Sequence, residues 1–196
     1  MLHLLTSRAT LENGEYAIDV CVVNPDDYFL VASDKAYGFI CKGDEILTRN
    51  KGGRALITLP NEANLLPILK VNNKEEDLIV VVSKQGKLLI YKVSELPILG
   101  RGKGNKLIGI NTAKLEVGID GIACIAVIST QDALILHCGK RLLNISNKEV
   151  IEKISSRTKV GDTLPRGFQR VDFIEVVQEK EGEEEQLDFS LDVEVL

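Results

Sequence analysis

The chain has 196 residues, of which 44% are hydrophobic and 5% aromatic, and it carries a formal net charge of −5. This length is sufficient for one sizeable core and does not require two domains. The acidic balance, taken over the whole chain, argues against a nucleic-acid-binding protein, because such proteins are usually basic. The apolar residues are mainly Ile, Leu and Val, which favour strands, so we expect an all-β protein.

The N-terminal stretch MLHLLTSRATLENGEY has no basic region followed by a long apolar segment. It therefore has the features of neither a signal peptide nor a membrane span, and we expect a cytoplasmic protein with no membrane partner. Residues 2–6 form a short apolar run, which predicts a lone leading strand.

Four cysteines lie far apart, and no C-x-x-C pair occurs. With His3 and His137 they form no recognised ligand spacing, so no metal site is expected. Each cysteine lies in an apolar run, which predicts a buried reduced thiol, as in a cytosolic protein. The four are Cys21, Cys41, Cys124 and Cys138.

The chain repeats a scheme of two apolar strands around a short polar turn. VASDKAYGFIC (31–41) matches VVSKQGKLLIY (81–91) at an offset of 50 residues, and IAVISTQDALILH (125–137) follows the same scheme. Each segment predicts a tight hairpin. About four strands in 50 residues is the scale of a propeller blade. Three blades are expected, near residues 16–59, 65–110 and 122–177.

One helix is predicted, over residues 147–155 (NKEVIEKIS), as a short insertion in the third unit. Asn147 is the expected N-cap, and Val150, Ile151 and Ile154 would share one face.

Residues 100–110, GRGKGNKLIGI, place three glycines and two basic residues in five positions. Such a loop could cradle a nucleotide phosphate, contact a nucleic-acid backbone or turn between two strands. The glycines at 100, 102 and 104 do not have the G-x-G-x-x-G spacing, and no P-loop motif occurs, which argues against a nucleotide site. A flexible link between blades explains the glycines, because glycine permits positive φ.

A plain link does not explain the basic residues that accompany the glycines. The segment RNKGGRALITL (49–59) has the same character as RGKGNKLIGI (101–110). Repeated basic links would place positive charge on the same edge of each blade, which suits the evenly spaced phosphates of DNA. The basic residues of the two links are Arg49, Lys51, Arg54, Arg101, Lys103 and Lys106.

The segment 178–196 holds eight acidic residues and one lysine, which leaves the remainder of the chain slightly basic. We therefore expect a domain over residues 1–177 and an acidic, solvated C-terminal tail over residues 178–196, which would compete with DNA for a basic face. The final LDFSLDVEVL alternates apolar and polar residues, so a half-buried strand is the alternative.

Several segments resemble, in the same order, the C-terminal domain of the A subunit of bacterial DNA topoisomerase IV. They are ASDKAYGFIC, RNKGGRALITLP, LPILGRGKGNKLIGI and HCGKRLLNI…GDTLPRGFQRVDFIEV, within residues 4–177. The related domain of gyrase A is the second candidate. Its box rich in glutamine, arginine and glycine is not intact here, which favours topoisomerase IV and a weaker grip on DNA.

This resemblance implies a β-pinwheel, a propeller relative in which blades exchange strands. It further implies duplex DNA binding and bending around a basic outer rim, in the accessory module of a type II topoisomerase that decatenates and relaxes DNA during chromosome segregation. The implied partners are duplex DNA, the remainder of the topoisomerase IV A subunit, plus the B subunit, at the bacterial nucleoid. The family has five or more blades, so three blades make a partial wheel, whose open edges would permit self-association.

The resemblance also assigns candidate residues. The expected DNA-binding residues are Arg49, Lys51, Arg54, Lys84, Lys87, Arg101, Lys103, Lys106, Lys140, Arg141, Arg157, Lys159, Arg166 and Arg170. Lys84 and Lys87 flank a hairpin tip, and the last four lie in a long loop over residues 157–170.

No catalytic residue and no cofactor are expected in this chain, because the family places its ATP, Mg²⁺ and breakage–reunion tyrosine in other domains. The tyrosines here are therefore expected to be strand residues: Tyr16, Tyr28, Tyr37 and Tyr91. The alternative function is a propeller-type protein-interaction scaffold that uses the acidic tail as its contact. Salt dependence of duplex binding would distinguish the two functions.

Overall fold

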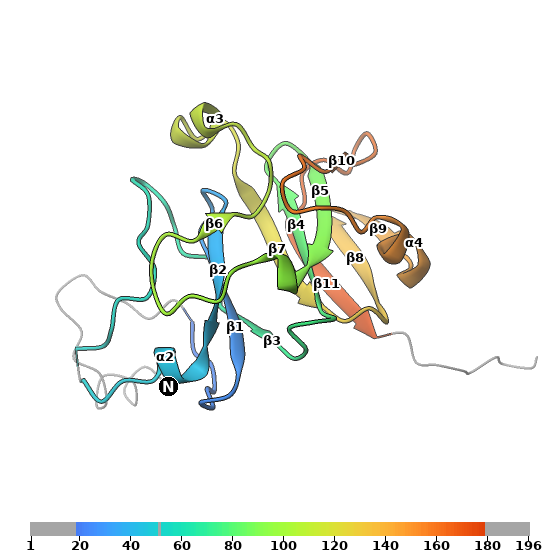
Figure 1. Cartoon of the computed structure of the whole chain (residues 1–196). Helices are drawn as coiled ribbons and strands as arrows, with labels where there is room; N and C mark the ends of the chain where they lie inside the picture. Colours follow the sequence, from blue (N-terminus) through green and yellow to red (C-terminus); the bar gives the residue numbers. More distant parts are fainter. Residues whose placement is uncertain (1–18, 51, 179–196) are drawn as a thin grey trace, which may run out of the picture.

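A computed structural model describes residues 19–50 and 52–178 (Figure 1). The described chain is made of antiparallel sheets with a few short helical turns, which confirms the all-β class. The strands are β1 (Tyr28–Ala32), β2 (Tyr37–Lys42), β3 (Leu69–Val71), β4 (Leu78–Ser83), β5 (Lys87–Lys92), β6 (Asn105–Lys106), β7 (Ile122–Ile128), β8 (Asp132–Cys138), β9 (Arg141–Ile145), β10 (Asp162–Thr163) and β11 (Phe173–Gln178). The helical segments are α2 (Gly43–Ile46), η1 (Val93–Glu95), α3 (Thr112–Glu116) and α4 (Asn147–Glu152).

Three sheets repeat one plan. Their strand orders are β3-β1-β2-β6, β10-β5-β4-β7 and β11-β8-β9. Each sheet contains one hairpin, formed by β1–β2, β4–β5 or β8–β9. The first strand of each hairpin also pairs with a later strand, which is β3, β7 or β11. The internal repetition expected from the sequence is therefore present in the sheets.

The first two sheets borrow their fourth strand from the following repeat. β6 follows the second hairpin in sequence but pairs with β2 of the first sheet, and β10 follows the third hairpin but pairs with β5 of the second. This is the strand exchange that the resemblance implied. Because of it, the sheets do not coincide with the expected blades at residues 16–59, 65–110 and 122–177.

The expected hairpin over residues 125–137 is wrong. β7 pairs with β4 in the second sheet, whereas β8 pairs with β9 and β11 in the third. The short polar segment between β7 and β8 therefore carries the chain from one sheet to the next. The third hairpin turns instead at Gly139 and Lys140, between β8 and β9.

An aspartate closes each turn that leads into a hairpin. The carboxylate of Asp132 accepts a hydrogen bond from the backbone amide of Ser129 at 2.7 Å. Asp27 and Asp77 accept backbone amides in the same way, at 3.0 and 2.8 Å, just before β1 and β4. These local contacts distinguish a turn between sheets from a turn within a hairpin.

The second sheet lies between the other two and is buried on both faces. Every residue of β4 is buried. Ile79 and Val81 join the core shared with the first sheet, whereas Val80 and Val82 join the core shared with the third. In β8, by contrast, buried and partly exposed residues alternate, so one face of the third sheet remains open among the described residues.

The predicted helix and thiols are largely confirmed. α4 lies within residues 147–155, but its N-cap is Ser146, whose hydroxyl accepts the amide of Glu149 in a capping box. Cys41, Cys124 and Cys138 are buried and free, while Cys21 is exposed because it precedes the first strand.

The described tyrosines, Tyr28, Tyr37 and Tyr91, are strand residues as expected. Several sequence-based predictions concern residues outside the described part: the strand at residues 2–6, Tyr16, Lys51 and most of the acidic tail.

Candidate nucleic-acid interface

The structure identifies a third basic link that sequence reasoning treated as part of a long loop. We define the first link as residues 49–58, the second as 100–107 and the third as 157–164. Each contains R-x-K, with a leucine six or seven residues after the arginine. This shared pattern was available in the sequence, but the third copy has one glycine where the second has three.

The second and third links dock on neighbouring hairpins in the same way. The backbone amide of Leu107 donates to the carbonyl of Ala36 at 2.9 Å, and that of Leu164 donates to the carbonyl of Gly86 at 2.9 Å. Ala36 and Gly86 are 50 residues apart and occupy the same place in the first and second hairpin turns. Each link therefore lies along the edge of the preceding hairpin.

The glycines of these links allow a close backbone approach. Gly104 and Gly161 have φ values of 77° and 84°, in the left-handed region that favours glycine. A Cβ atom on either would collide with the backbone of the adjacent strand, at Gly38 or Leu88. The glycines thus shape the path of the chain, which supports the interpretation as links.

The three links form one continuous row, coloured teal, yellow-green and orange in Figure 1. Ile57 of the first link bridges Gly102 of the second, and the amide of Thr58 donates to the Gly102 carbonyl at 2.9 Å. Just beyond the second link, the amide of Gly109 donates to the carbonyl of Lys159 at 2.8 Å. Basic residues of successive repeats are thereby brought together across the sheets.

Four basic residues of the row are exposed. Arg49, Arg101 and Lys159 have exposed side chains, and no side-chain partner is found for them among the described residues. Lys103 is also exposed, and its ammonium lies 3.9 Å from the centre of the Tyr37 ring, a cation–π distance. Arg49, Arg101 and Lys159 are therefore free to meet an anionic ligand, whereas Lys103 is exposed but also contacts Tyr37.

Arg54 and Lys106 are partly engaged within the protein. The Arg54 guanidinium forms an ion pair with Glu45 at 2.7 Å and also donates to the Glu45 carbonyl at 2.9 Å. The Lys106 ammonium donates to the carbonyl of Ile110 at 2.9 Å and to the hydroxyl of Thr112 at 2.8 Å. Both side chains help to hold their links in place.

Arg157 is the most constrained arginine of the three links. Its side chain is half-buried and donates to the backbone carbonyls of Glu95 and Lys106. Its backbone amide donates to the Glu95 carboxylate at 2.9 Å. Arg157 therefore fastens the third link to η1, which follows β5, and to the second link.

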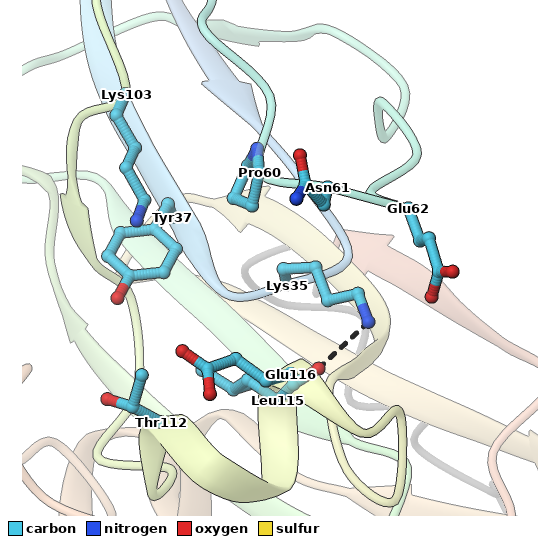
Figure 2. Close-up of a pocket in the computed structure, with 9 residues that line it drawn as sticks. All are labelled: Lys35, Tyr37, Pro60, Asn61, Glu62, Lys103, Thr112, Leu115 and Glu116. Atoms are coloured by element: carbon cyan, nitrogen blue, oxygen red, sulfur yellow. Dashed lines mark hydrogen bonds between the residues drawn. The ribbon is translucent and has the colours of Figure 1, made fainter.

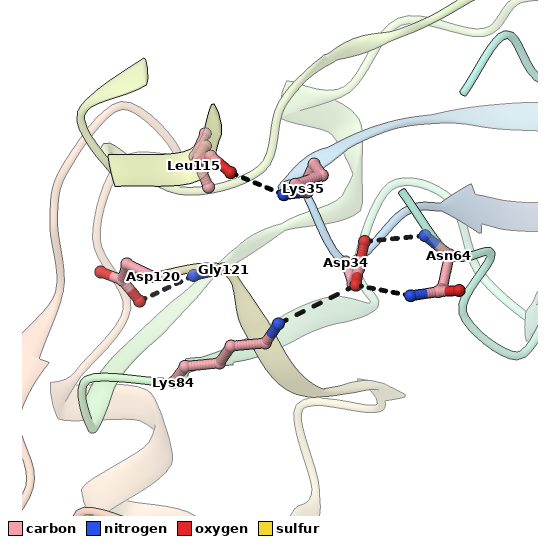
Figure 3. Close-up of polar contacts among 7 residues, drawn as sticks. All are labelled: Asp34, Lys35, Asn64, Lys84, Leu115, Asp120 and Gly121. Carbon is pink, nitrogen blue, oxygen red and sulfur yellow. Dashed lines mark hydrogen bonds and ion pairs between the residues drawn. The ribbon is translucent and has the colours of Figure 1, made fainter. Parts of the chain in front are cut away.

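Both lysines of the second hairpin tip contact other parts of the protein, and Figure 3 shows the contact of Lys84 with the first hairpin turn. The Lys84 ammonium lies 3.9 Å from the carboxylate of Asp34 in the first hairpin turn. That carboxylate also accepts two hydrogen bonds from Asn64, at 2.9 and 3.2 Å. Lys87 donates to the Thr163 hydroxyl. The structure thus gives both lysines contacts with the protein itself.

The other candidates surround the third hairpin turn. Lys140, Arg141, Arg166 and Arg170 are exposed, and the Arg141 guanidinium lies beside Gly167. Arg166 follows the third link directly, so this second basic group continues the row towards β9.

A cleft of about 490 Å³ opens beside Lys103, between the first hairpin turn, the segment after the first link and α3 (Figure 2). Lys35 points across it and donates to the carbonyl of Leu115 at 2.8 Å. Glu62 and Glu116 line the same cleft, so its charges are mixed. The cleft therefore lies between two repeats, and the hydrogen bond of Lys35 to Leu115 bridges it.

The described residues show no group of ligands for a metal ion and no helix that could cross a membrane. Burial raises the pKa of the Cys124 thiol to about 11 and also raises the pKa of Cys41. Neither thiol is therefore a thiolate at neutral pH, so neither is a candidate nucleophile.

Comparisons with known proteins agree with this geometry. The family model described as "DNA gyrase C-terminal domain, beta-propeller" matches residues 27–72 and 77–126, two copies at the 50-residue offset of the first two hairpins. The solved structure of the E. coli ParC C-terminal domain is 35% identical, with a TM-score of 0.80, over 89% of this chain and 70% of that one. The chain belongs to the family of C-terminal domains found in gyrase A and in the A subunit of topoisomerase IV.

Full-length relatives place the chain on the topoisomerase IV side of that family. It is 41% identical over 154 residues to the A subunit of DNA topoisomerase 4 from Pseudomonas aeruginosa and 37% identical over 172 residues to that of Escherichia coli K12. These matches cover 78% and 88% of this chain, but 20% and 23% of the relatives. The chain thus spans about a fifth of the length of each relative. The resemblance seen in the sequence and the propeller-type fold are confirmed.

Proposed function

We propose that this chain binds and bends duplex DNA without sequence preference, as the accessory module of a type II topoisomerase. The observation that carries the proposal is the continuous row of three R-x-K links with exposed Arg49, Arg101, Lys103 and Lys159. The module would assist decatenation and supercoil relaxation at the nucleoid. The remainder of the A subunit, the B subunit, ATP and Mg²⁺ would supply the chemistry elsewhere.

The arrangement of the basic side chains suits phosphates better than bases. They lie on links along sheet edges, and no described helix of the length that enters a major groove accompanies them. Contacts to phosphates fix the position of a protein on DNA but carry no direct sequence information. The ligand we propose is therefore duplex DNA of any sequence.

Bending is proposed from the spread of the row over neighbouring sheets, because the second link pairs with the first sheet and the third link with the second sheet. We expect a duplex that contacts all three links to curve, and bending a site of 20–30 base pairs by 40–90° costs on the order of 1–6 kcal/mol. Phosphate contacts on successive links would offset this cost. The scaffold alternative predicts no such contacts.

The double variant R101A/K103A tests the proposed interface. We expect weaker binding to every duplex alike, with the slope of log affinity against log salt reduced by about 2, since each phosphate contact contributes about 0.9. The matched control is K70A/K74A, because Lys70 pairs with Asp27 at 2.9 Å, Lys74 lies beside Tyr28, and neither lysine belongs to a link. Loss of preference for one sequence at an unchanged slope would contradict the proposal.

Ring closure of a DNA fragment shorter than about 150 base pairs tests bending separately, because that length is about one persistence length. We expect the chain to increase the yield of ligated circles, and R101A/K103A to reduce that increase. Binding without any increase would reject bending and retain binding. The scaffold alternative predicts no duplex binding even at low salt.

A further inference from the structure

The second and third basic links are joined at one junction, which is built largely from backbone groups. The amide of Gly109, just beyond the second link, donates to the carbonyl of Lys159 in the third link at 2.8 Å. A Cβ atom on Gly109 would lie 2.6 Å from the carbonyl oxygen of Thr158, so the two backbones are in close contact. The position of one link relative to the other therefore depends on this junction.

The Arg157 side chain connects the third link to two other segments at the junction. Its Nε atom donates to the carbonyl of Glu95 in η1 at 3.2 Å, and its Nη1 atom donates to the carbonyl of Lys106 in β6. β6 pairs with the first sheet, whereas β10 in the third link pairs with the second sheet. Because the guanidinium is planar and has donors in a fixed fork, one side chain can serve both acceptors at once.

The Glu95 carboxylate also holds the start of the third link. It accepts hydrogen bonds from the Ser156 hydroxyl at 3.4 Å and from the backbone amide of Arg157 at 2.9 Å. Glu45 occupies the same place in the first repeat, three residues after the N-cap of its helical turn, but it pairs with Arg54 of the first link. Glu95 thus attaches the link of the next repeat, whereas Glu45 attaches the link of its own repeat.

We propose that Arg157 and Glu95 are positioning residues for DNA bending, which set the angle between the second and third links without contacting a phosphate. This inference rests on the proposed function, and it replaces the direct DNA contact of Arg157 that the sequence suggested. The Arg157 side chain is half-buried and directed to two carbonyls, whereas Lys103 and Lys159, on the two links that it joins, are exposed. Loss of the junction would leave both lysines able to contact phosphates, but it would let the two links move relative to each other.

Ring closure and salt dependence together test the role of Arg157. At saturating protein, R157A should reduce the increase in ligated circles by about twofold or more, because the links no longer impose one curvature. R157A should change the slope of log affinity against log salt by less than about 0.3, whereas loss of one phosphate contact would reduce the slope by about 0.9. R157K keeps the charge but has no fork for both carbonyls, so it should lower ring closure as R157A does.

The opposite result would assign Arg157 to the DNA interface itself. If R157A reduced the salt slope by about 0.9 and R157K restored both the slope and ring closure, Arg157 would be a phosphate contact, and the proposal would be overturned.

The variant E95A separates positioning from charge. Removal of a carboxylate beside a basic row should strengthen the attraction for DNA by charge alone. We nevertheless expect E95A to reduce ring closure, because it releases the amide of Arg157. E152A is the matched control, since Glu152 is an exposed acidic residue of α4 with no side-chain partner among the described residues. Ring closure that is unchanged or increased in E95A, as in E152A, would overturn the positioning role.

Hydrogen exchange without DNA distinguishes failure of this inference from failure of the proposed function. The amide of Gly109 should exchange about fivefold faster or more in R157A and E95A, whereas the amide of Leu66, which donates to the Ala32 carbonyl in the first sheet, should be unchanged. Unchanged exchange at Gly109 would overturn the junction whether or not the chain binds DNA. Faster exchange at Gly109 in a chain that does not bind duplex DNA would retain the junction but overturn the proposed function, and with it the role in bending.

Discussion

The second and third basic links are built alike but use their arginines differently. Both dock through a leucine amide on a hairpin turn, and both begin with R-x-K. Arg101 of the second link is exposed, whereas Arg157 of the third is half-buried and donates to the carbonyls of Glu95 and Lys106. The same motif therefore supplies an exposed side chain in one repeat and an anchor in the next.

The residue before each arginine accounts for part of the difference. In the third link, Ser156 and the amide of Arg157 donate to the Glu95 carboxylate. In the second link the corresponding place is near Gly100, which lies against Glu45 but has no hydroxyl. Glu45 pairs with Arg54 of the first link instead. Glu95 thus fastens the start of the third link, whereas Glu45 pairs with the first link.

The largest effect is expected where the links dock. Ala36 and Gly86 both have positive φ, 63° and 69°, and both accept a link amide. G86A should destabilise the protein by about 2 kcal/mol or more, because a side chain would strain the backbone and collide with Gln169. A36G should be neutral or stabilising by up to about 1 kcal/mol. Urea unfolding measures the change in the free energy of unfolding for each variant. If G86A and A36G destabilised the protein equally, the claim that both positions favour glycine would be wrong.

A smaller effect should separate the two arginines. R157A should lower the free energy of unfolding by about 1–2 kcal/mol, because it leaves two carbonyls without their charged donor. R101A should change it by less than about 0.5 kcal/mol, as for an exposed side chain. Parallel urea titrations check this, and a large loss in R101A would show that Arg101 is also an anchor.

The smallest effect on stability is expected at low pH, from Asp27, the aspartate that precedes the first hairpin. The Asn24 amide and the Lys70 ammonium lower the pKa of Asp27. Its stabilising contribution is therefore complete above the unfolded pKa, near about 4, and is lost as the pH falls through the lower folded pKa. D27N should reduce stability at neutral pH and make the acid-induced loss shallower. D26N is the control, since Asp26 is almost fully exposed. If D27N left the dependence of the free energy of unfolding on pH unchanged, Asp27 would not contribute to the acid-induced loss.

Local patterns in the sequence predicted the all-β class, the first two hairpins and the short helix. They did not predict which strands pair, because the turn before Asp132 is as short and polar as a hairpin turn. Strand exchange also places β6 and β10 far in sequence from their partners. The charge of the links was visible in the sequence, but the fixing of Arg157 by Glu95 depends on contacts 62 residues apart.

The salt dependence of duplex affinity tests the central claim most directly. If Arg49, Arg101, Lys103 and Lys159 each contact one phosphate, log affinity should fall against log salt with a slope of about −3.6, since each contact contributes about −0.9. The slope should be the same for duplexes of different sequence. Fluorescence anisotropy of a labelled duplex between about 50 and 200 mM salt measures it. Absent binding at the lowest salt, or an affinity that does not change with salt, would contradict the account.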